Sequence, residues 1–101
     1  MPSVADLVEP KDVGERAGQY LTRAADVLRA SGRVRLVAFS RLRVSAEVDD
    51  GGPRHVELVA SGDRLEVTCD CGSAGDDGWC PHAVATAFET WERAPKRRTS
   101  S

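Results

Sequence analysis

The residues with the clearest chemical potential lie close together in the last third of the chain. Cys69, Cys71, Cys80 and His82 follow the spacing C-x-C…C-x-H, which uses all three cysteines and one of the two histidines. The segment between the two pairs is long enough to fold back and bring them together. Three thiolates and one imidazole are a tetrahedral zinc donor set, with Zn–S bonds of about 2.3 Å and Zn–N bonds of about 2.0 Å. The sequence therefore predicts one Zn²⁺ per chain, bound by these four residues.

The same donor set indicates what the metal would do. Four protein ligands leave no open position for water or substrate, so we expect the zinc to be structural. The sequence has neither the His-x-Glu pattern of zinc deaminases nor the His-Glu-x-x-His pattern of zinc proteases. No phosphate-binding glycine loop and no recognisable nucleophile with its base stand out. We therefore expect no enzymatic activity, no catalytic residues and no small-molecule substrate.

The residues flanking the ligands extend this pattern. The run from Leu65 to Cys71 leads into the site, Cys80-Pro81-His82 closes it, and the run from Ala83 to Phe88 continues as a helix. Together these residues resemble the SWIM-type zinc finger family. The resemblance implies protein–protein or DNA contacts, often beside Swi/Snf-type ATPases or transposases. The chain departs from the family pattern at Gly72, where proline is common, and at Pro81, where a basic residue is common.

The segments that must position the ligands indicate an α+β fold. Apolar residues recur at helical spacing over residues 12–31, with Asp12 as the N-cap and Glu15 completing a capping box. From residue 33 the apolar period changes to two, which predicts a small antiparallel sheet of about four strands over residues 33–71. The zinc loop and a C-terminal helix fill residues 69–94. The zinc site thus closes a junction between the last strand and the last helix.

This layout gives one domain with two less structured ends. We expect a flexible N-terminal arm over residues 1–11, a single SWIM-like domain over residues 12–94, and a polar basic tail over residues 95–101. Within the sheet, alternation places Leu42, Val44, Ala46 and Val48 on one face. It also places Cys69 and Cys71 on one side if their strand continues, so both sulfurs can face the same ion.

Composition sets the broad class of the protein. The 101 residues are 41% hydrophobic and 30% charged, which is typical of a soluble globular chain. No apolar run approaches the length of a membrane span, and the first ten residues lack the layout of a signal peptide. We expect a cytoplasmic location, where a reducing environment keeps thiols available to metal. The formal charge of −2 gives no reason to expect a polyanionic partner.

Two classes of binding partner fit these observations, and a third role follows from the thiols. A protein partner, such as a Swi/Snf-type ATPase, is favoured by the negative charge and by the acidic zinc loop. Direct nucleic-acid binding would use an acid-free arginine segment and the basic tail. Redox sensing would use oxidation of the ligands to eject zinc. The basic residues in question are Arg29, Arg33, Arg35, Arg41 and Arg43, with Arg93, Lys96, Arg97 and Arg98 near the end.

Two further aromatic residues, His55 and Trp79, each allow two interpretations. His55 is a rival zinc ligand, but it lies outside the C-x-C…C-x-H spacing and fits an exposed strand residue better. Trp79 could contact a partner, but its place beside Cys80 favours packing around the metal site.

Overall fold

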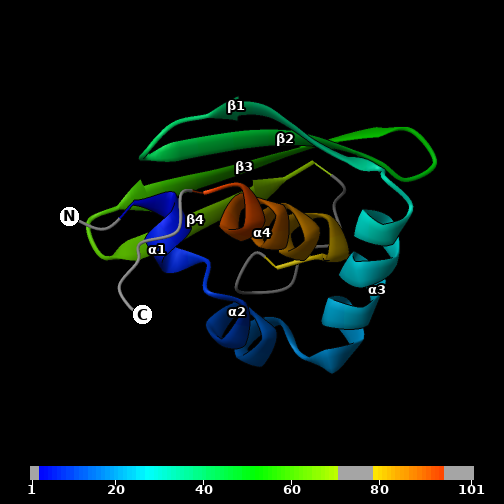
Figure 1. Ribbon diagram of the computed structural model, residues 1–101, viewed down its shortest axis with the longest axis horizontal. Coiled ribbons are helices and arrows are strands. Elements are labelled where there is room, and N and C mark those ends of the chain that lie inside the picture. Colours follow the sequence, from blue (N-terminus) through cyan, green and yellow to red (C-terminus); the bar gives the residue numbers. More distant parts are fainter. Residues whose placement is uncertain (1–2, 71–78, 95–101) are drawn as a thin grey trace.

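The computed structural model describes residues 3–70 and 79–94. It is an α+β fold, as the sequence predicts, with a four-stranded antiparallel sheet in the order β1-β2-β3-β4. The helices lie against one face of this sheet (Figure 1). Cys71, the zinc loop over residues 72–78 and the tail over residues 95–101 lie outside the described residues.

The elements follow one another with short connections. The helices are α1 (Val4–Leu7), α2 (Pro10–Ala17), α3 (Gln19–Ala30) and α4 (Pro81–Arg93), and the strands are β1 (Val34–Phe39), β2 (Arg43–Asp49), β3 (Pro53–Ser61) and β4 (Arg64–Cys69). Helix α4 packs against all four strands and against α1, α2 and α3. It is therefore the element on which the rest of the fold converges (Figure 1).

The two-residue period of the strands produces the core-facing side of the sheet. Alternate side chains of β2 and β3 point to the face that the helices cover, whereas the residues between them point to the other face, where Ser45 is nevertheless buried. In β1 the register shifts between Leu36 and Ala38, and Val37 at this irregularity is 57% exposed. The buried set is Val44, Ala46, Val48, Val56, Leu58 and Ala60. Alternation in the sequence thus identifies the buried face of the two central strands correctly.

The outward face of the sheet is lined by ion pairs between neighbouring strands. Arg35 of β1 pairs with Glu47 of β2 at 2.7 Å, and Arg43 of β2 pairs with Glu57 of β3 at 2.8 Å. Opposite charges on facing strands stabilise the pairing and keep this face polar.

The N-terminal region differs from the flexible arm predicted over residues 1–11. Residues Val4–Leu7 form α1, and Ser3 caps this helix by accepting from the Asp6 amide while Asp6 accepts from the Ser3 amide. Val4 and Val8 are fully buried, and the Val4 amide donates to the Arg41 carbonyl at 2.8 Å. Burial of two branched side chains provides the free energy that holds this segment on the sheet.

The single helix predicted over residues 12–31 is also wrong in detail. The structure has two helices that meet at Gly18, whose φ of +92° is a conformation that glycine adopts more easily than other residues. The capping box at Asp12 and Glu15 is not formed, because α2 begins earlier. Pro10 takes its first position, where the missing amide N–H costs nothing. The chain therefore turns a corner between α2 and α3.

Candidate metal centre

Two of the predicted ligands are positioned by the first turn of α4. Cys80 is the N-cap residue, with extended backbone, and its Sγ accepts from the Ala83 amide at 3.4 Å. Pro81 then occupies the first helical position, as predicted, and His82 follows it. The positive end of the helix favours negative charge on the Cys80 sulfur. Cys80 is fully buried and His82 is 5% exposed, so this end of the helix faces the interior.

The third ligand arrives from the sheet. Cys69 is the last residue of β4 and pairs with Val56 of β3, which is part of the core face. Alternation therefore aims the Cys69 side chain at the side of the sheet that α4 covers. The ligands meet because β4 and α4 pack together.

The geometry of the three side chains fits a tetrahedral ion. The Nδ1 atom of His82 lies 3.7 Å from Sγ of Cys69 and 3.8 Å from Sγ of Cys80. Bond lengths for zinc at a tetrahedral angle predict an S···N separation of about 3.6 Å. One ligand atom from each residue lies within 4.8 Å of the others, so the three donors surround one position. The fourth predicted ligand, Cys71, lies outside the described residues.

The other ring nitrogen of His82 has a partner that the sequence did not reveal. Nε2 of His82 lies 2.8 Å from a carboxylate oxygen of Asp50, in the turn between β2 and β3. An ionised carboxylate only accepts hydrogen bonds, so the ring proton belongs on Nε2 and the lone pair of Nδ1 faces the sulfurs. This hydrogen bond is also the main cause that lowers the pKa of Asp50, with Arg54 and Arg33 contributing through their charge.

A second carboxylate ties the end of β4 to β3. Oδ1 of Asp70 accepts from the backbone amide of His55 at 3.0 Å, and the Asp70 amide donates to the His55 carbonyl at 3.2 Å. Asp70 directly follows Cys69, so these bonds fix the backbone from which that ligand projects.

His55 and Trp79 occupy the environments that the sequence predicts, an exposed strand position for His55 and a packed one for Trp79. His55 is exposed on the outward face of β3, on the opposite side of the sheet from Cys69, and its ring lies 4.0 Å from Glu57. It does not belong to the cluster formed by the described ligands. Trp79 is 4% exposed and part of the hydrophobic core, which agrees with a packing role.

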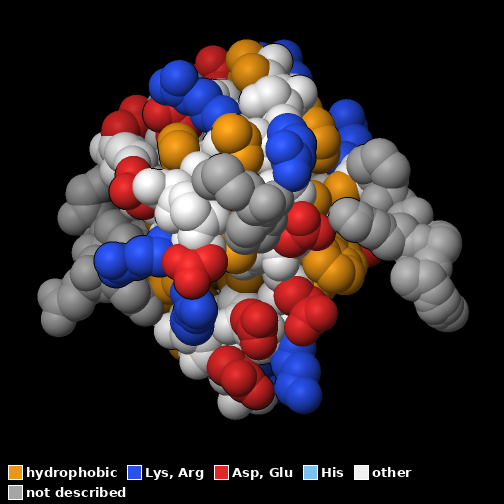
Figure 2. All heavy atoms as spheres, turned by 90° about the vertical axis from the view of Figure 1, so that its left-hand side faces the viewer, with side chains coloured by type: hydrophobic (Ala, Val, Ile, Leu, Met, Phe, Trp, Pro, Cys, Tyr) orange, Lys and Arg blue, Asp and Glu red, His pale blue; other side chains and the backbone are white. Residues whose placement is uncertain are grey.

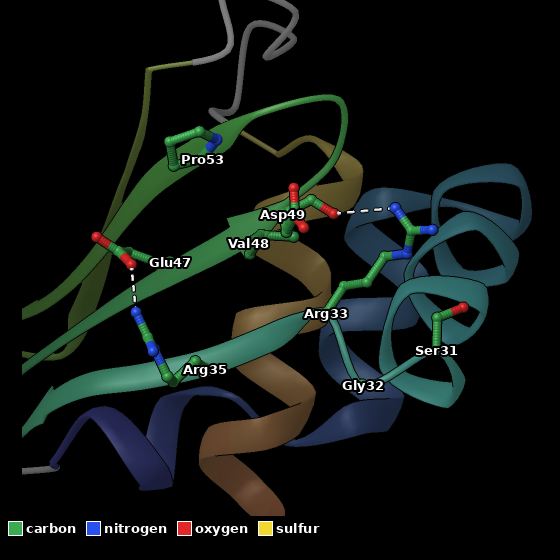
Figure 3. A pocket seen from close by; sticks show the side chains of 8 residues that line it. All are labelled: Ser31, Gly32, Arg33, Arg35, Glu47, Val48, Asp49 and Pro53. Carbon is green, nitrogen blue, oxygen red and sulfur yellow. Dashed lines mark hydrogen bonds and ion pairs between the residues drawn. The ribbon is translucent and has the colours of Figure 1, made fainter.

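The arginine segment considered for nucleic acid is largely engaged with acidic and carbonyl groups. Arg29 pairs with Glu89 at 3.2 Å, and Arg43 pairs with Glu57. Arg33 and Arg35 line an open depression of about 650 Å³ at the end of α3. There, Arg33 points toward the Asp49 carbonyl and Arg35 toward Glu47 (Figure 3). Two acidic residues accompany the two arginines, so this depression has little net charge.

Charges of both signs are also mixed on the face of the molecule that lies to the left in Figure 1. Among the described residues of this face, basic and acidic side chains are interspersed with hydrophobic ones (Figure 2). A phosphate backbone is best bound by a continuous basic surface. The arrangement on this face does not provide one.

Comparison with known proteins adds no family assignment. Neither protein-family models, nor curated proteins, nor solved structures match this chain. Within residues 3–70 and 79–94, no helix is long and apolar enough to cross a membrane.

Proposed function

We propose that this protein is a zinc-stabilised, non-enzymatic interaction module, in which Cys71 joins Cys69, Cys80 and His82 to hold one Zn²⁺. The observation that carries this proposal is the convergence of two sulfurs and Nδ1 of His82 at separations of 3.7 and 3.8 Å. These values match the edges of a zinc tetrahedron. Soft thiolate donors select zinc over magnesium or calcium, which prefer oxygen.

The proposed metal is structural because the chain itself fills the coordination shell. With four protein donors, no position remains for a water molecule that could be activated. Zinc would instead fix the last strand relative to the last helix, since Cys69 belongs to β4 and both Cys80 and His82 belong to the start of α4. A closed site of this kind stabilises the folded structure and the surface around it, and does not catalyse a reaction.

The metal assignment is tested by mass and by substitution. We expect native mass spectrometry to find one zinc ion per chain, and Cys71→Ser and Cys80→Ser each to lose it. His55→Ala is the matched control, because it removes the remaining histidine from the exposed face of the sheet without touching the cluster. Zinc retention in Cys80→Ser at wild-type affinity would refute the site.

The surface around the strand–helix junction is the proposed contact for a protein partner. The resemblance to SWIM-type fingers supports a partner such as a Swi/Snf-type ATPase. The formal charge of −2 and the pairing of arginines on the sheet support a protein rather than a polyanion. Titration of a Swi/Snf-type ATPase with zinc-loaded protein should show binding that Cys80→Ser abolishes.

Direct nucleic-acid binding is the competing function, and salt dependence separates the two. Binding to duplex or single-stranded DNA through phosphate contacts would weaken steeply as salt concentration rises. We expect no measurable binding to either at low salt. Binding with a steep salt slope, reduced by substitution of Arg33 and Arg35, would replace the protein-partner proposal.

A further inference from the structure

The turn between β2 and β3 reaches the metal centre from a part of the chain far from the ligands. It consists of Asp50, Gly51 and Gly52, and the Asp50 amide donates to the Gly52 carbonyl at 3.0 Å. Gly51 and Gly52 have φ values of +73° and +137°, which glycine adopts without strain. The tight turn leaves the Asp50 carboxylate directed at His82, 32 residues further along the chain.

We infer that Asp50 is a positioning residue for the zinc site, which fixes His82 with its proton on Nε2 and makes Nδ1 the metal-binding atom. This inference rests on the proposed zinc function and extends it beyond the four ligands. An imidazole without a partner can carry its proton on either nitrogen and can rotate about its side-chain bonds. The 2.8 Å contact with Asp50 removes both freedoms before the metal binds.

Several features of the geometry support this role over a surface ion pair. The His82 side chain is 7% exposed, so the hydrogen bond has a buried end. The Nδ1 atom of the same ring faces the sulfurs of Cys69 and Cys80 while Nε2 faces Asp50, so one ring orientation satisfies both contacts. Carboxylate partners of this kind orient zinc-binding histidines and raise their basicity as ligands, and their removal weakens metal affinity about 10–100-fold.

The test compares zinc affinity in full-length variants by competition with a chromophoric chelator. Asp50→Ala should bind zinc about 10–100-fold more weakly than the wild-type chain. Asp50→Asn keeps an oxygen that can accept from Nε2 but loses the charge, so its affinity should lie between the two. Asp49→Asn is the matched control. It changes the preceding acid, whose backbone rather than carboxylate contacts Arg33.

A spectroscopic readout separates positioning from a general loss of stability. Long-range ¹H–¹⁵N correlation spectra show which ring nitrogen of a histidine carries the proton, and His55→Ala identifies the His82 signals, because the chain has two histidines. In zinc-loaded wild type and Asp50→Asn, the proton should be on Nε2. Asp50→Ala should show exchange between ring states or faster loss of that proton.

The outcomes for the inference and for the zinc function are distinguishable. Failure of the wild-type chain to bind zinc would remove the proposed function itself. Zinc binding by wild type, with unchanged affinity and an unchanged His82 spectrum in Asp50→Ala and Asp50→Asn, would overturn the role of Asp50 alone. If Asp50→Ala does not fold, the Asp50→Asn affinity decides, and equality with wild type would refute the inference.

Discussion

Glu57 shows how a single side chain on the outward face of the sheet responds to its neighbours. Its Oε2 accepts from Nε and Nη2 of Arg43 at 3.1 and 2.8 Å, and from the Ser45 hydroxyl at 3.3 Å. The hydrogen bonds from Arg43 are the main cause that lowers the pKa of Glu57 below its ordinary value of 4.5. The ionised form is therefore favoured in the folded protein.

This shift predicts a pH dependence of stability. Because the folded pKa is lower than the unfolded one, Glu57 contributes fully above pH 4.5, and the contribution is lost as the pH falls through the lower folded value. As the pH is lowered from 5, the free energy of unfolding should fall less in Glu57→Gln and in Arg43→Ala than in wild type. Urea unfolding at each pH measures this difference. Any release of metal in acid affects all three proteins equally and cancels in the comparison. Identical profiles for wild type and Glu57→Gln would contradict the prediction.

The individual residues of the candidate metal centre differ in how far the sequence could identify them. The grouping of Cys69, Cys80 and His82 was predictable because their types and spacing lie within one short segment, although packing of β4 against α4 is what brings them together. Asp50 was not, because its contact with His82 depends on the packing of the β2–β3 turn against α4. An aspartate followed by two glycines indicates a turn in any protein, and nothing in that signal specifies where its carboxylate points.

At the level of elements, the junction between α2 and α3 allows two glycines to be compared. Gly18→Ala should destabilise the protein by about 1–3 kcal/mol, because φ is +92° and an alanine there is strained even though no atom lies within 4 Å of the added carbon. Gly14→Ala should stabilise it by about 0.5–1 kcal/mol, because this position lies within α2 and the nearest atom, the Thr22 hydroxyl, is 3.8 Å away.

Denaturant unfolding of the two single variants measures both effects. The opposite signs are the diagnostic result. If any added side-chain carbon in this region were destabilising, both variants would be less stable than wild type. Stabilisation by Gly18→Ala would instead favour the continuous helix that the sequence predicts.

The short helix α1 leads to a second prediction at this scale. Val4→Ala and Val8→Ala should each cost about 2 kcal/mol of unfolding free energy, because both side chains are fully buried. Val27→Ala in α3 is the matched control and should change stability little, since Val27 is 65% exposed. Thermal or urea unfolding distinguishes them. Equally small effects in all three variants would contradict the burial of Val4 and Val8 and would support the flexible N-terminal arm that the sequence predicts.

The elements were predictable where a periodic pattern lasts over several residues. Apolar and polar residues alternate over 43–49 in β2 and over 55–58 in β3, so the buried faces of these strands follow directly from the sequence. Helix α1 has only four residues, which is about one turn and too short for any period to show. The break between α2 and α3 at Gly18 could not be predicted from apolar spacing, because this spacing continues across Gly18 and carries no information about a change in backbone direction.

For the whole molecule, the position of α4 makes the proposed metal important to more than its own loop. This helix contacts all four strands and the other three helices, Cys80 is its N-cap residue and His82 lies in its first turn. A chelator that removes zinc should therefore lower the melting temperature by roughly 10 °C or more, because structural zinc sites contribute directly to folding.

Hydrogen exchange should locate this effect. The amides of the first turn of α4 and of the end of β4 should lose protection most, whereas β2 and β3, which are paired along their full length, should lose least. An unchanged melting temperature after verified removal of zinc would show that packing of α4 alone is sufficient.

The order of the strands has a consequence for how copies of the protein meet at high concentration. Among the described residues β1 borders the sheet on one side, and Arg35 projects from it with Arg33 just before it. Charged side chains at a sheet border must lose water before another strand can pair there, and Arg35 would also have to leave its ion pair with Glu47, so both residues oppose growth of a sheet across molecules. We therefore expect this border to resist pairing between copies, whatever the protein binds.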